Sequence, residues 1–342
     1  MKSIDEIVLD LTKVLPARQQ EIVMGRFGLG KFKKPNTLAA IGAKYDITRE
    51  RVRQIEAAAI AVLAGAVSNS PECQLVLKEG RARLEDAGGV LKKDDFFTKP
   101  LPVAGVSDRH LALLLASSKA FRFRDEDDDF WPLYYLSDAS LKAMQSSVSQ
   151  WSDTLEKRKE AVLAGAYNAE FDKFVKAKNL NGTHAKNFLA AAKGFHKNPY
   201  GDMGLAEWPE IRPSTIRDRI YLILKKTGAP LHFETIAKEI NKVGFDSRKA
   251  LPATVHNELI KDERFILVGR GMYGLSEHGY EPGTAREVIH RILKDKGPMK
   301  PRDVVLAVQK ERFLKPNTVL VNLQNRNFFQ RLSDGTYHVR QA

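Results

Sequence analysis

Residues 48–56 read Thr-Arg-Glu-Arg-Val-Arg-Gln-Ile-Glu, and they have the pattern of a helix that could enter a DNA groove. At about 3.6 residues per turn, Val52, Ile55 and Ala59 fall on one apolar face of this helix. The opposite face carries side chains that can read base edges: Arg49, Glu50, Arg53 and Gln54. Arginine can bind guanine through two hydrogen bonds, glutamine suits adenine, and glutamate accepts from the cytosine amino group. A salt-bridged surface helix would show the same pattern, because Glu50 lies among three arginines.

The residues just before this stretch favour DNA binding, because they complete a helix-turn-helix. The pattern of residues 37–45 predicts a short amphipathic helix, in which Gly42 leaves room for a second helix to cross closely. Residues 46–47 are expected to form the turn, and Thr48 is a good N-cap for the next helix. In such a motif the second helix is free to enter the major groove.

A supporting helix is predicted upstream, within residues 15–29, and it ends at a glycine. Residues 15–63 closely resemble region 4 of bacterial primary-type sigma factors, the part that reads the promoter −35 element. The resemblance is carried by Arg26-Phe27-Gly28-Leu29, by Thr37-Leu38 with Ile41-Gly42, and by all of residues 48–56. It implies that promoter-like double-stranded DNA is a partner of this chain.

In that family, the positions that match Arg49, Glu50, Arg53 and Gln54 contact bases or the nearby backbone. Arg51 lies where phosphates or activators are met. The predicted DNA contacts of this segment are Thr37, Thr48, Arg49, Glu50, Arg51, Arg53 and Gln54.

A complete sigma factor also has an aromatic-rich helix that melts the −10 element and further helices that grip the polymerase. Only about 14 residues precede the resemblance here, and the loop over residues 30–35 is unusually basic. We therefore expect a promoter-binding or polymerase-associated regulator rather than an autonomous sigma factor.

The charge of the chain is concentrated at its two ends. Of the net charge of +13, residues 1–70 contribute +4, residues 71–212 contribute none and residues 213–342 contribute +9. The ends therefore suit a polyanion and the middle does not. The 342 residues contain no apolar stretch of membrane-spanning length and no signal peptide pattern, which predicts a cytoplasmic, nucleoid-associated protein without membrane contact. The single Cys73 excludes an internal disulfide and a thiolate zinc cluster.

The last 130 residues contain an internal repeat, which indicates a duplicated domain. Pro252-Ala253-Thr254-Val255, Leu259, Phe265, Gly271, Tyr273 and Leu275 recur 64 positions later as Pro316-Asn317-Thr318-Val319, Leu323, Phe329, Gly335, Tyr337 and Val339. The pattern predicts helices over 215–226, 233–243 and 252–261 in the first copy, and over 284–296, 301–312 and 316–325 in the second. Hairpins turn at Arg270-Gly271 and at Ser333-Asp334-Gly335. Three helices and a hairpin form a winged helix.

Residues 213–342 resemble the HARE-type helix-turn-helix domain, a winged-helix family found in the delta subunit of bacterial RNA polymerase and beside some restriction and chromatin proteins. The first copy matches well, and the second matches less well because Ser333-Asp334-Gly335 replaces Gly269-Arg270-Gly271. The resemblance is carried by Pro230-Leu231-His232-Phe233 and by Gly269-Arg270-Gly271-Met272-Tyr273-Gly274-Leu275. Some members of this family bind DNA and others bind protein, and both alternatives stay open here. The resemblance implies that core RNA polymerase is a further partner.

The middle of the chain shows weaker traces of the same element order. Matches at a constant spacing of 70 predict a degenerate winged helix with a long first helix over residues 138–212. Another is predicted over 71–137, with strands at 121–124 and 131–136 and a wing tip, Asp125-Glu126-Asp127-Asp128-Asp129, that would repel phosphate. This tip is either a solvated loop or a protein-facing or ion-binding one.

The predicted fold is mainly α with small β hairpins, an N-terminal helix-turn-helix followed by tandem winged-helix domains. Its five expected domains cover residues 1–70, 71–137, 138–212, 213–280 and 281–342.

The two C-terminal copies offer further candidate DNA contacts on their third helices and wings. These are Asn257, Lys261 and Arg270 in the first copy, and Lys315, Asn322 and Arg326 in the second. Basic wing residues commonly hold phosphate, and asparagine on a recognition helix can read adenine, although ordinary solvated surface explains each residue singly. The aromatic residues Phe265, Tyr273, Phe329 and Tyr337 are expected in the hairpin cores.

The sequence shows no catalytic constellation, no metal-ligand spacing among its eight histidines and no phosphate-binding loop. We therefore predict no enzymatic activity, no cofactor, no metal and no small-molecule substrate. The leading hypothesis is a sequence-specific transcription regulator that reads a −35-like element and associates with RNA polymerase. The alternative is a polymerase-binding adaptor that contacts DNA only non-specifically. A nuclease accessory module, the third interpretation, has little support because no carboxylate-rich metal motif is visible.

Overall fold

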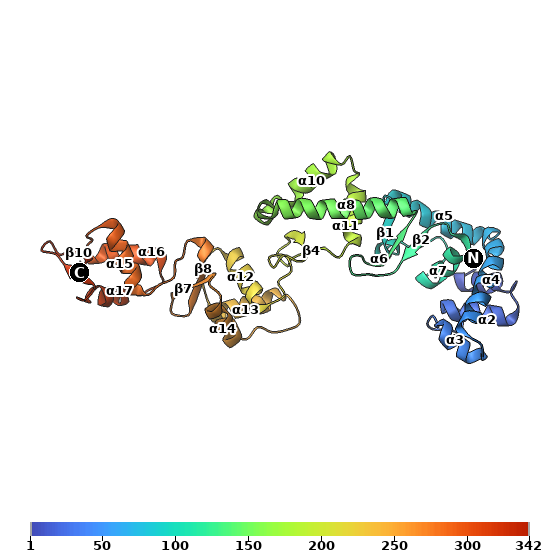
Figure 1. Cartoon of the computed structure of the whole chain (residues 1–342), viewed down its shortest axis with the longest axis horizontal. Helices are drawn as coiled ribbons and strands as arrows, with labels where there is room; N and C mark the ends of the chain where they lie inside the picture. The colour runs from blue at the N-terminus through green and yellow to red at the C-terminus, as the bar shows by residue number, and fades with distance from the viewer. Residues whose placement is uncertain (1, 341–342) are drawn as a thin grey trace. The chain divides into compact units, whose positions relative to one another are not determined.

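The computed structural model describes residues 2–340, and these form two compact units (Figure 1). The first unit holds the residues up to His196 together with Met203–Ala206. The second holds Lys197–Asp202 and the residues from Glu207 onward. Helices dominate both units, and the strands belong to small sheets of two or three strands. The predicted fold class, mainly α with small hairpins, is confirmed.

The helix-turn-helix predicted within residues 15–63 is present. Four helices build this region: α1 (Ile4–Thr12), α2 (Ala17–Phe27), α3 (Leu38–Tyr45) and α4 (Arg49–Ser68). Asp46 has a left-handed φ of 53°, which ends α3 and reverses the chain just before α4 begins. An added Cβ on Gly42 would lie 2.7 Å from the Ile47 carbonyl oxygen. The glycine therefore accommodates the turn itself rather than the body of a crossing helix.

The next segment has the element order of a winged helix. Its elements are α5 (Pro71–Asp86), β1 (Val90–Lys92), α6 (Lys93–Phe96), α7 (Asp108–Ser118), β2 (Arg122–Arg124) and β3 (Leu133–Tyr135). The three strands form an antiparallel sheet in the order β1-β3-β2, with Val90 and Arg122 both opposite Tyr135. The strands β2 and β3 are shorter than the strands predicted at 121–124 and 131–136.

The helix-turn-helix and this winged helix share one hydrophobic core. Buried residues from both contribute to it, for example Ile4, Leu63, Leu114 and Phe121. The third helix, α7, packs against α2 and α4. In a typical winged helix this third helix faces DNA, but here α7 packs in part against α2 and α4.

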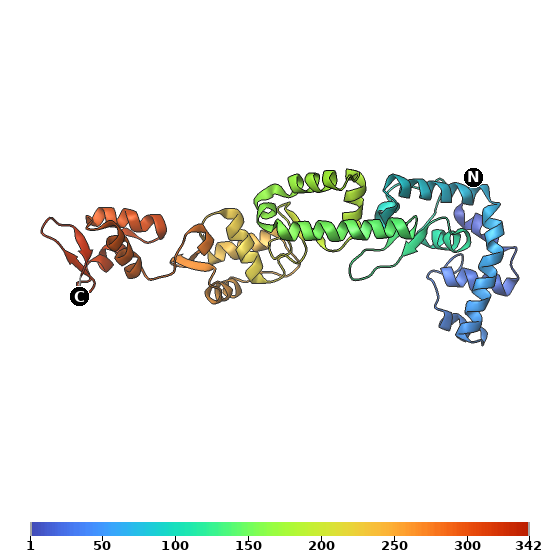
Figure 2. The ribbon, with the colours of Figure 1, turned by 45° about the horizontal axis from the view of Figure 1, so that its top comes forward.

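The following segment packs on the same small sheet. Its elements are α8 (Asp138–Lys157), α9 (Lys159–Ala161), the wide turn η1 (Val162–Ala166), α10 (Tyr167–Ala177), α11 (Gly182–Ala191), β4 (Phe195–Lys197) and β5 (Met203–Leu205). A second buried cluster joins Met144 and Phe188 of these helices to Val90 and Leu133 of the sheet. α8 and α10 run side by side in two views (Figures 1 and 2). The ring centroids of Trp151 in α8 and Phe171 in α10 lie 5.3 Å apart. The winged helix of the first unit and the helices α8 to α11 are therefore joined by their packing.

The first winged helix of the second unit follows the predicted element order closely. Its elements are α12 (Ile216–Thr227), β6 (Leu231–His232), α13 (Phe233–Val243), α14 (Pro252–Lys261), β7 (Phe265–Gly269), β8 (Met272–Leu275) and η2 (Ser276–His278). The sheet order β6-β8-β7 is the same as that of the winged helix in the first unit. His232 pairs with Met272, so this histidine lies in the first strand of the domain.

The second winged helix of this unit has a smaller sheet. Its elements are α15 (Ala285–Lys296), α16 (Pro301–Glu311), α17 (Pro316–Leu323), β9 (Phe329–Arg331) and β10 (Tyr337–Val339). A single bridge between Met299 and Tyr337 stands where β6 stands in the first copy. Phe265, Tyr273 and Phe329 are buried and Tyr337 packs at the edge of its core.

A polar contact joins the two winged helices of the second unit. The Phe313 amide donates to the Val268 carbonyl at 2.7 Å, beside the edge strand β7. The guanidinium of Arg312, which is only 4% exposed, donates to the carbonyls of Leu267, Glu281 and Gly283. Arg312 thus binds the first copy and the connecting segment at once.

No single helix among residues 2–340 is long and apolar enough to cross a membrane. The α4 and α5 helices together have the required length and composition, but the chain bends by 90° between them, and both contribute residues to the core of the first unit.

Candidate nucleic-acid interface

The outer face of α4 carries the predicted base-reading residues. Val52 and Ala59 are buried on the inner face, and Ile55 is half-buried. The predicted readers and their neighbour are all exposed: Arg49, Glu50, Arg51, Arg53 and Gln54. The structure therefore brings these five side chains together on one accessible surface near the start of the helix.

Two of these residues are paired with each other. The Arg53 Nη2 atom lies 2.6 Å from Glu50 Oε1, and both side chains are more than half exposed. Arg51 Nη1 donates to Gln54 Oε1 at 3.2 Å. Hydrogen bonding from Arg53 lowers the pKa of the Glu50 carboxyl, and Glu50 raises the pKa of Arg53. Exposed ion pairs of this kind contribute little to stability, so DNA can displace this one at little cost.

The two predicted threonines cap the helices of the motif. The Thr37 hydroxyl accepts from the Ala40 amide at 3.1 Å, and the Thr48 hydroxyl accepts from the Arg51 amide at 3.1 Å. Each hydroxyl keeps its proton, so it can still donate to a phosphate oxygen. Both residues are exposed at the helix starts, where the positive ends of the helix dipoles add to this attraction.

Glu21 holds α3 in place relative to α2. Its carboxylate accepts from the Tyr45 hydroxyl at 2.5 Å, from Lys31 Nζ at 2.7 Å and from Lys44 Nζ at 3.0 Å. Hydrogen bonds from Lys31 and then from Tyr45 and Lys44 lower the pKa of Glu21 to about 2. The position of the turn before α4 thus depends on an ionised carboxylate.

Acidification is therefore expected to loosen this part of the motif. A carboxylate whose pKa is depressed on folding stabilises the fold above its ordinary pKa, near 4.5, and loses that contribution as pH falls towards 2. We expect the hydrogen-exchange protection factors of residues 38–45, which are corrected for the intrinsic exchange rate at each pH, to fall between pH 5 and pH 2.5. Glu21→Gln should show much of this loss of protection already at pH 5. Asp10→Asn is the control, because its pKa is also about 2 but its partners Lys2 and Lys13 lie outside the motif. An Asp10→Asn effect on residues 38–45 as large as that of Glu21→Gln would contradict this role.

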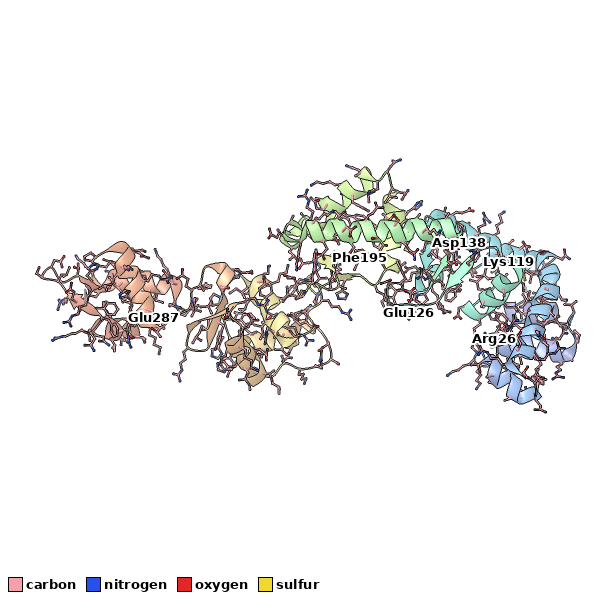
Figure 3. The ribbon with its side chains drawn as sticks, viewed as in Figure 1. Arg26, Lys119, Glu126, Asp138, Phe195 and Glu287 are labelled. Carbon is pink, nitrogen blue, oxygen red and sulfur yellow. The ribbon has the colours of Figure 1, made fainter. Side chains whose placement is uncertain are left out.

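The basic loop before α3 adds two residues that the predicted contacts did not include. Lys33 and Lys34 are exposed and lie close to Thr37 in the chain. Arg109 donates to the Gly28 carbonyl at 2.7 Å and to the Lys33 carbonyl at 3.1 Å. Arg26, which is labelled in Figure 3, donates to the Asn36 carbonyl at 3.0 Å. These hydrogen bonds from Arg26 and Arg109 fix the loop backbone. The sequence signal for a phosphate contact in this loop was its run of three lysines among four residues.

The acidic wing tip is folded back on its own unit. Arg124 binds the Asp127 carboxylate, and Lys193 Nζ lies 2.6 Å from Glu126 Oε1. Asp127 also accepts from the Phe130 amide at 2.8 Å. Asp125 and Asp128 are exposed. This wing therefore faces protein on one side and solvent on the other, and its charge does not suit phosphate.

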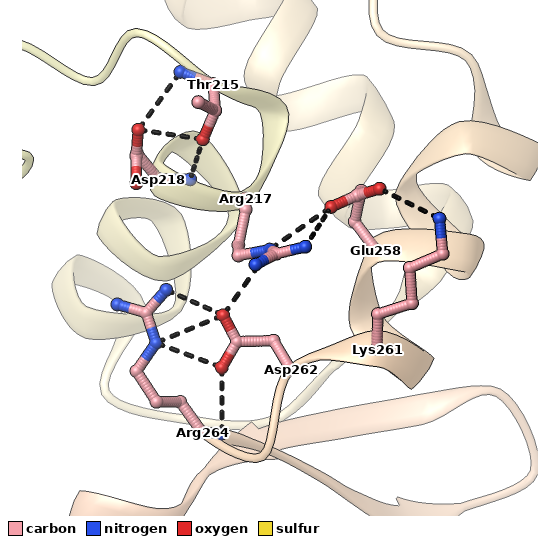
Figure 4. A network of polar contacts seen from close by, with 7 residues as sticks. All are labelled: Thr215, Arg217, Asp218, Glu258, Lys261, Asp262 and Arg264. Carbon is pink, nitrogen blue, oxygen red and sulfur yellow. Dashed lines mark hydrogen bonds and ion pairs between the residues drawn. The ribbon is translucent and has the colours of Figure 1, made fainter.

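In the first copy of the second unit, the predicted residues lie on an exposed surface of mixed character. Asn257, Lys261 and Arg270 are exposed. Lys261 Nζ is 3.6 Å from Glu258, which belongs to a network with Arg217, Asp262 and Arg264 (Figure 4). Part of the Lys261 charge is therefore compensated within the domain. Leu251 and Ile260 of the same helix region are 62% and 64% exposed.

In the second copy, the three predicted residues differ in accessibility. Lys315, at the start of α17, and Arg326, just after its end, are exposed. Asn322 is half-buried, and its side-chain amide donates to the Thr318 carbonyl at 2.8 Å. This internal bond makes Asn322 a weaker candidate for reading bases than Lys315 or Arg326.

Within residues 2–340, no three His, Cys, Asp or Glu side chains are grouped so that they could hold a metal ion.

Comparison with known proteins matches two of these regions. Residues 13–64 match the family model described as sigma-70, region 4. Residues 214–278 match the HARE-HTH model, described as a helix-turn-helix domain of ASXL and restriction endonuclease proteins. The chain is 40% identical over 70 residues to the RNA polymerase sigma factor SigA of Mycoplasma genitalium, a match that covers 20% of this chain and 14% of the sigma factor's length. No solved structure matches.

Both resemblances inferred from the sequence are thereby confirmed. The two matched families are helix-turn-helix families rather than enzyme families, and they support a DNA-binding role related to RNA polymerase and transcription.

Proposed function

We propose that this chain is a bacterial transcription regulator that binds promoter-like double-stranded DNA through α4. The observation that carries the proposal is the exposed face of α4. Arg49, Glu50, Arg53 and Gln54 lie together there, directly after the turn that ends α3 and the Thr48 cap of α4. This set of side chains covers guanine, cytosine and adenine edges, which an ordinary solvated face has no need to do. The sigma-70 region 4 match supports a −35-like target.

Phosphate contacts around this face would set the register of α4 on the duplex. Thr37 and Thr48 offer hydroxyl protons at the helix starts, Arg51 lies one position from the readers, and Lys33 and Lys34 extend from the preceding loop. Such contacts position a protein on DNA without specifying sequence. If the proposal is right, the protein is located in the cytoplasm and is associated with the nucleoid DNA.

Selection of bound duplexes from random DNA, done at two salt concentrations, tests the base-reading role. The native chain should recover a −35-like consensus. Glu50→Ala and Arg53→Ala should each relax base preference at one position by about 1 to 3 kcal/mol, because each removes one base-edge contact. A uniform loss of affinity on all sequences would show that α4 does not read bases.

Arg81→Ala is a matched control for these variants. Arg81 is 2.9 Å from Glu85 on the exposed side of α5, in an ion pair as exposed as that of Arg53 with Glu50. The Arg81→Ala variant should leave the recovered consensus unchanged. It removes one positive charge, as Arg53→Ala does, but outside the proposed interface.

A second candidate function is an RNA polymerase-binding adaptor with non-specific DNA contacts. The exposed Leu251 and Ile260 favour it, because an apolar third helix suits a protein surface better than a phosphate backbone. Purified core polymerase and this chain should then form a complex without DNA, and Leu251→Asn with Ile260→Asn should weaken it. Retention of the full affinity in that double variant would exclude this surface.

A further inference from the structure

The last winged helix has an open groove beside the end of α17 and the β9–β10 hairpin. Its volume is about 770 Å³, and its lining residues are Gln324, Arg326, Phe329, Gln330, Arg331, Tyr337 and Arg340. Three of these seven residues are arginines, two are glutamines and none is acidic. The groove is thus lined by hydrogen-bond donors and positive charge.

The three arginines are not neutralised by the residues around them. Arg326, Arg331 and Arg340 form no ion pair with any residue between 2 and 340, whereas Arg291 of the same domain pairs with Glu281 and Glu311. Arg340 Nη1 donates to the Arg326 carbonyl at 2.9 Å, which fixes Arg340 beside the end of α17. Most guanidinium donors in the groove are therefore available to a ligand.

The two winged helices of this unit differ at equivalent positions of the third helix. Leu251, Ala253 and Ile260 in the first copy correspond, 64 positions later, to Lys315, Asn317 and Gln324. All six are exposed. Residues 281–342 carry 12 Lys and Arg against 6 Asp and Glu, whereas residues 213–280 carry 11 against 8. The second copy therefore has the surface of higher positive charge and lower apolar content.

We propose that this groove binds the phosphate backbone of double-stranded DNA, as a contact separate from α4. Guanidinium groups bind phosphate oxygens through paired hydrogen bonds, and glutamine amides add neutral donors. An unpaired base would need an exposed aromatic ring to stack on, but of the aromatic residues that line the groove Phe329 is 2% exposed and Tyr337 packs at the edge of the core. The neighbouring Phe328 is 38% exposed, but the Arg286 guanidinium lies 4.4 Å from the centre of its ring. The groove therefore fits a duplex backbone better than a single strand, and it carries no base preference.

The salt dependence of DNA binding by the full chain tests this proposal. The probe is a 30-base-pair duplex without a −35-like element, and the variants are Arg331→Gln and the triple R326Q/R331Q/R340Q. The logarithm of the binding constant should fall less steeply with the logarithm of salt concentration, by about 0.9 for Arg331→Gln and by about 2.7 for the triple variant. Lys310→Gln, which removes one exposed charge from α16, should leave the slope unchanged.

Further variants and competitors keep the result decisive. A triple arginine-to-lysine variant should keep the slope of the native chain, because its point charges still displace counterions. If the triple variant misfolds, Arg331→Gln alone decides the test. The Arg331 side chain makes no hydrogen bond to another residue of 2–340, so its replacement should not disturb the fold, whereas Arg340 bonds to the Arg326 carbonyl. An unchanged slope in Arg331→Gln, tighter binding of a single strand, or complete competition by millimolar inorganic phosphate would overturn the proposal. Glu50→Ala should not change the contribution of these arginines to the slope, so a failure here leaves the base-reading proposal untouched.

Discussion

Replacing Gly28 with alanine is expected to destabilise the helix-turn-helix by about 2 to 5 kcal/mol. Gly28 ends α2 with a φ of +66°, a left-handed conformation that costs a residue with a Cβ about 1 to 2 kcal/mol. The added Cβ would lie 2.5 Å from the Lys34 carbonyl carbon and from the Pro35 nitrogen, so the loop backbone must move. Such overpacking costs about 1 to 3 kcal/mol more.

The displaced loop would also weaken DNA binding. The Gly28 and Lys33 carbonyls are the acceptors of Arg109, and the Asn36 amide donates to the Gly25 carbonyl at 3.0 Å. Loss of these bonds would free the segment that leads to the Thr37 cap. Thermal unfolding and hydrogen exchange of residues 17–45 measure the destabilisation.

Gly65→Ala is the control with the opposite sign. Gly65 lies inside α4, and an added Cβ would meet nothing within 4 Å. Alanine should stabilise this helix by about 0.5 to 1 kcal/mol, because glycine is the more costly residue in a helix interior. Equal effects of the two substitutions would contradict the geometric explanation.

The elements of the helix-turn-helix and of the two C-terminal winged helices could be predicted because their signals are local. Thr37 and Thr48 cap α3 and α4 as their sequence positions indicate, and Pro252 begins α14. Gly244 ends α13 in a left-handed conformation, which is typical of a glycine at a helix end. These signals act within a few residues, so they are readable without knowledge of the tertiary structure.

The packing of the first unit could not be predicted in the same way. Nothing near Leu114 in the sequence shows that α7 contacts α4, and the pairing of Lys193 with Glu126 joins residues 67 positions apart. Likewise, the sequence placed three arginines near Glu50 but did not show that Arg53 is its partner. Side-chain geometry in space, rather than the residue pattern, decides each of these contacts. The four boundaries between the five predicted domains remain a prediction, although one core crosses the boundary at 70/71 and another the boundary at 137/138.

Replacing Arg312 with methionine is expected to separate the two C-terminal winged helices. The guanidinium is buried, and it donates to carbonyls of β7 and of the segment between the two copies, at Leu267, Glu281 and Gly283. Methionine fills a similar volume but donates no hydrogen bond. The three carbonyls could then be hydrated only if the two winged helices moved apart. Hydrogen bonds to a charged group contribute about 1.5 to 3 kcal/mol each, but the acceptors lie in exposed residues, which lowers the expected loss to about 2 to 3 kcal/mol in total.

The separation should be visible as faster hydrogen exchange at residues 266–269 and 279–284 and as faster proteolysis of the connecting segment. The cores of the two domains should stay protected, because each has its own buried cluster. Arg302→Met is the matched control, since Arg302 lies exposed in the first turn of the same helix, α16. If Arg312→Met exchanged no faster than Arg302→Met in these segments, the Phe313 amide bond to Val268 alone would hold the two domains together.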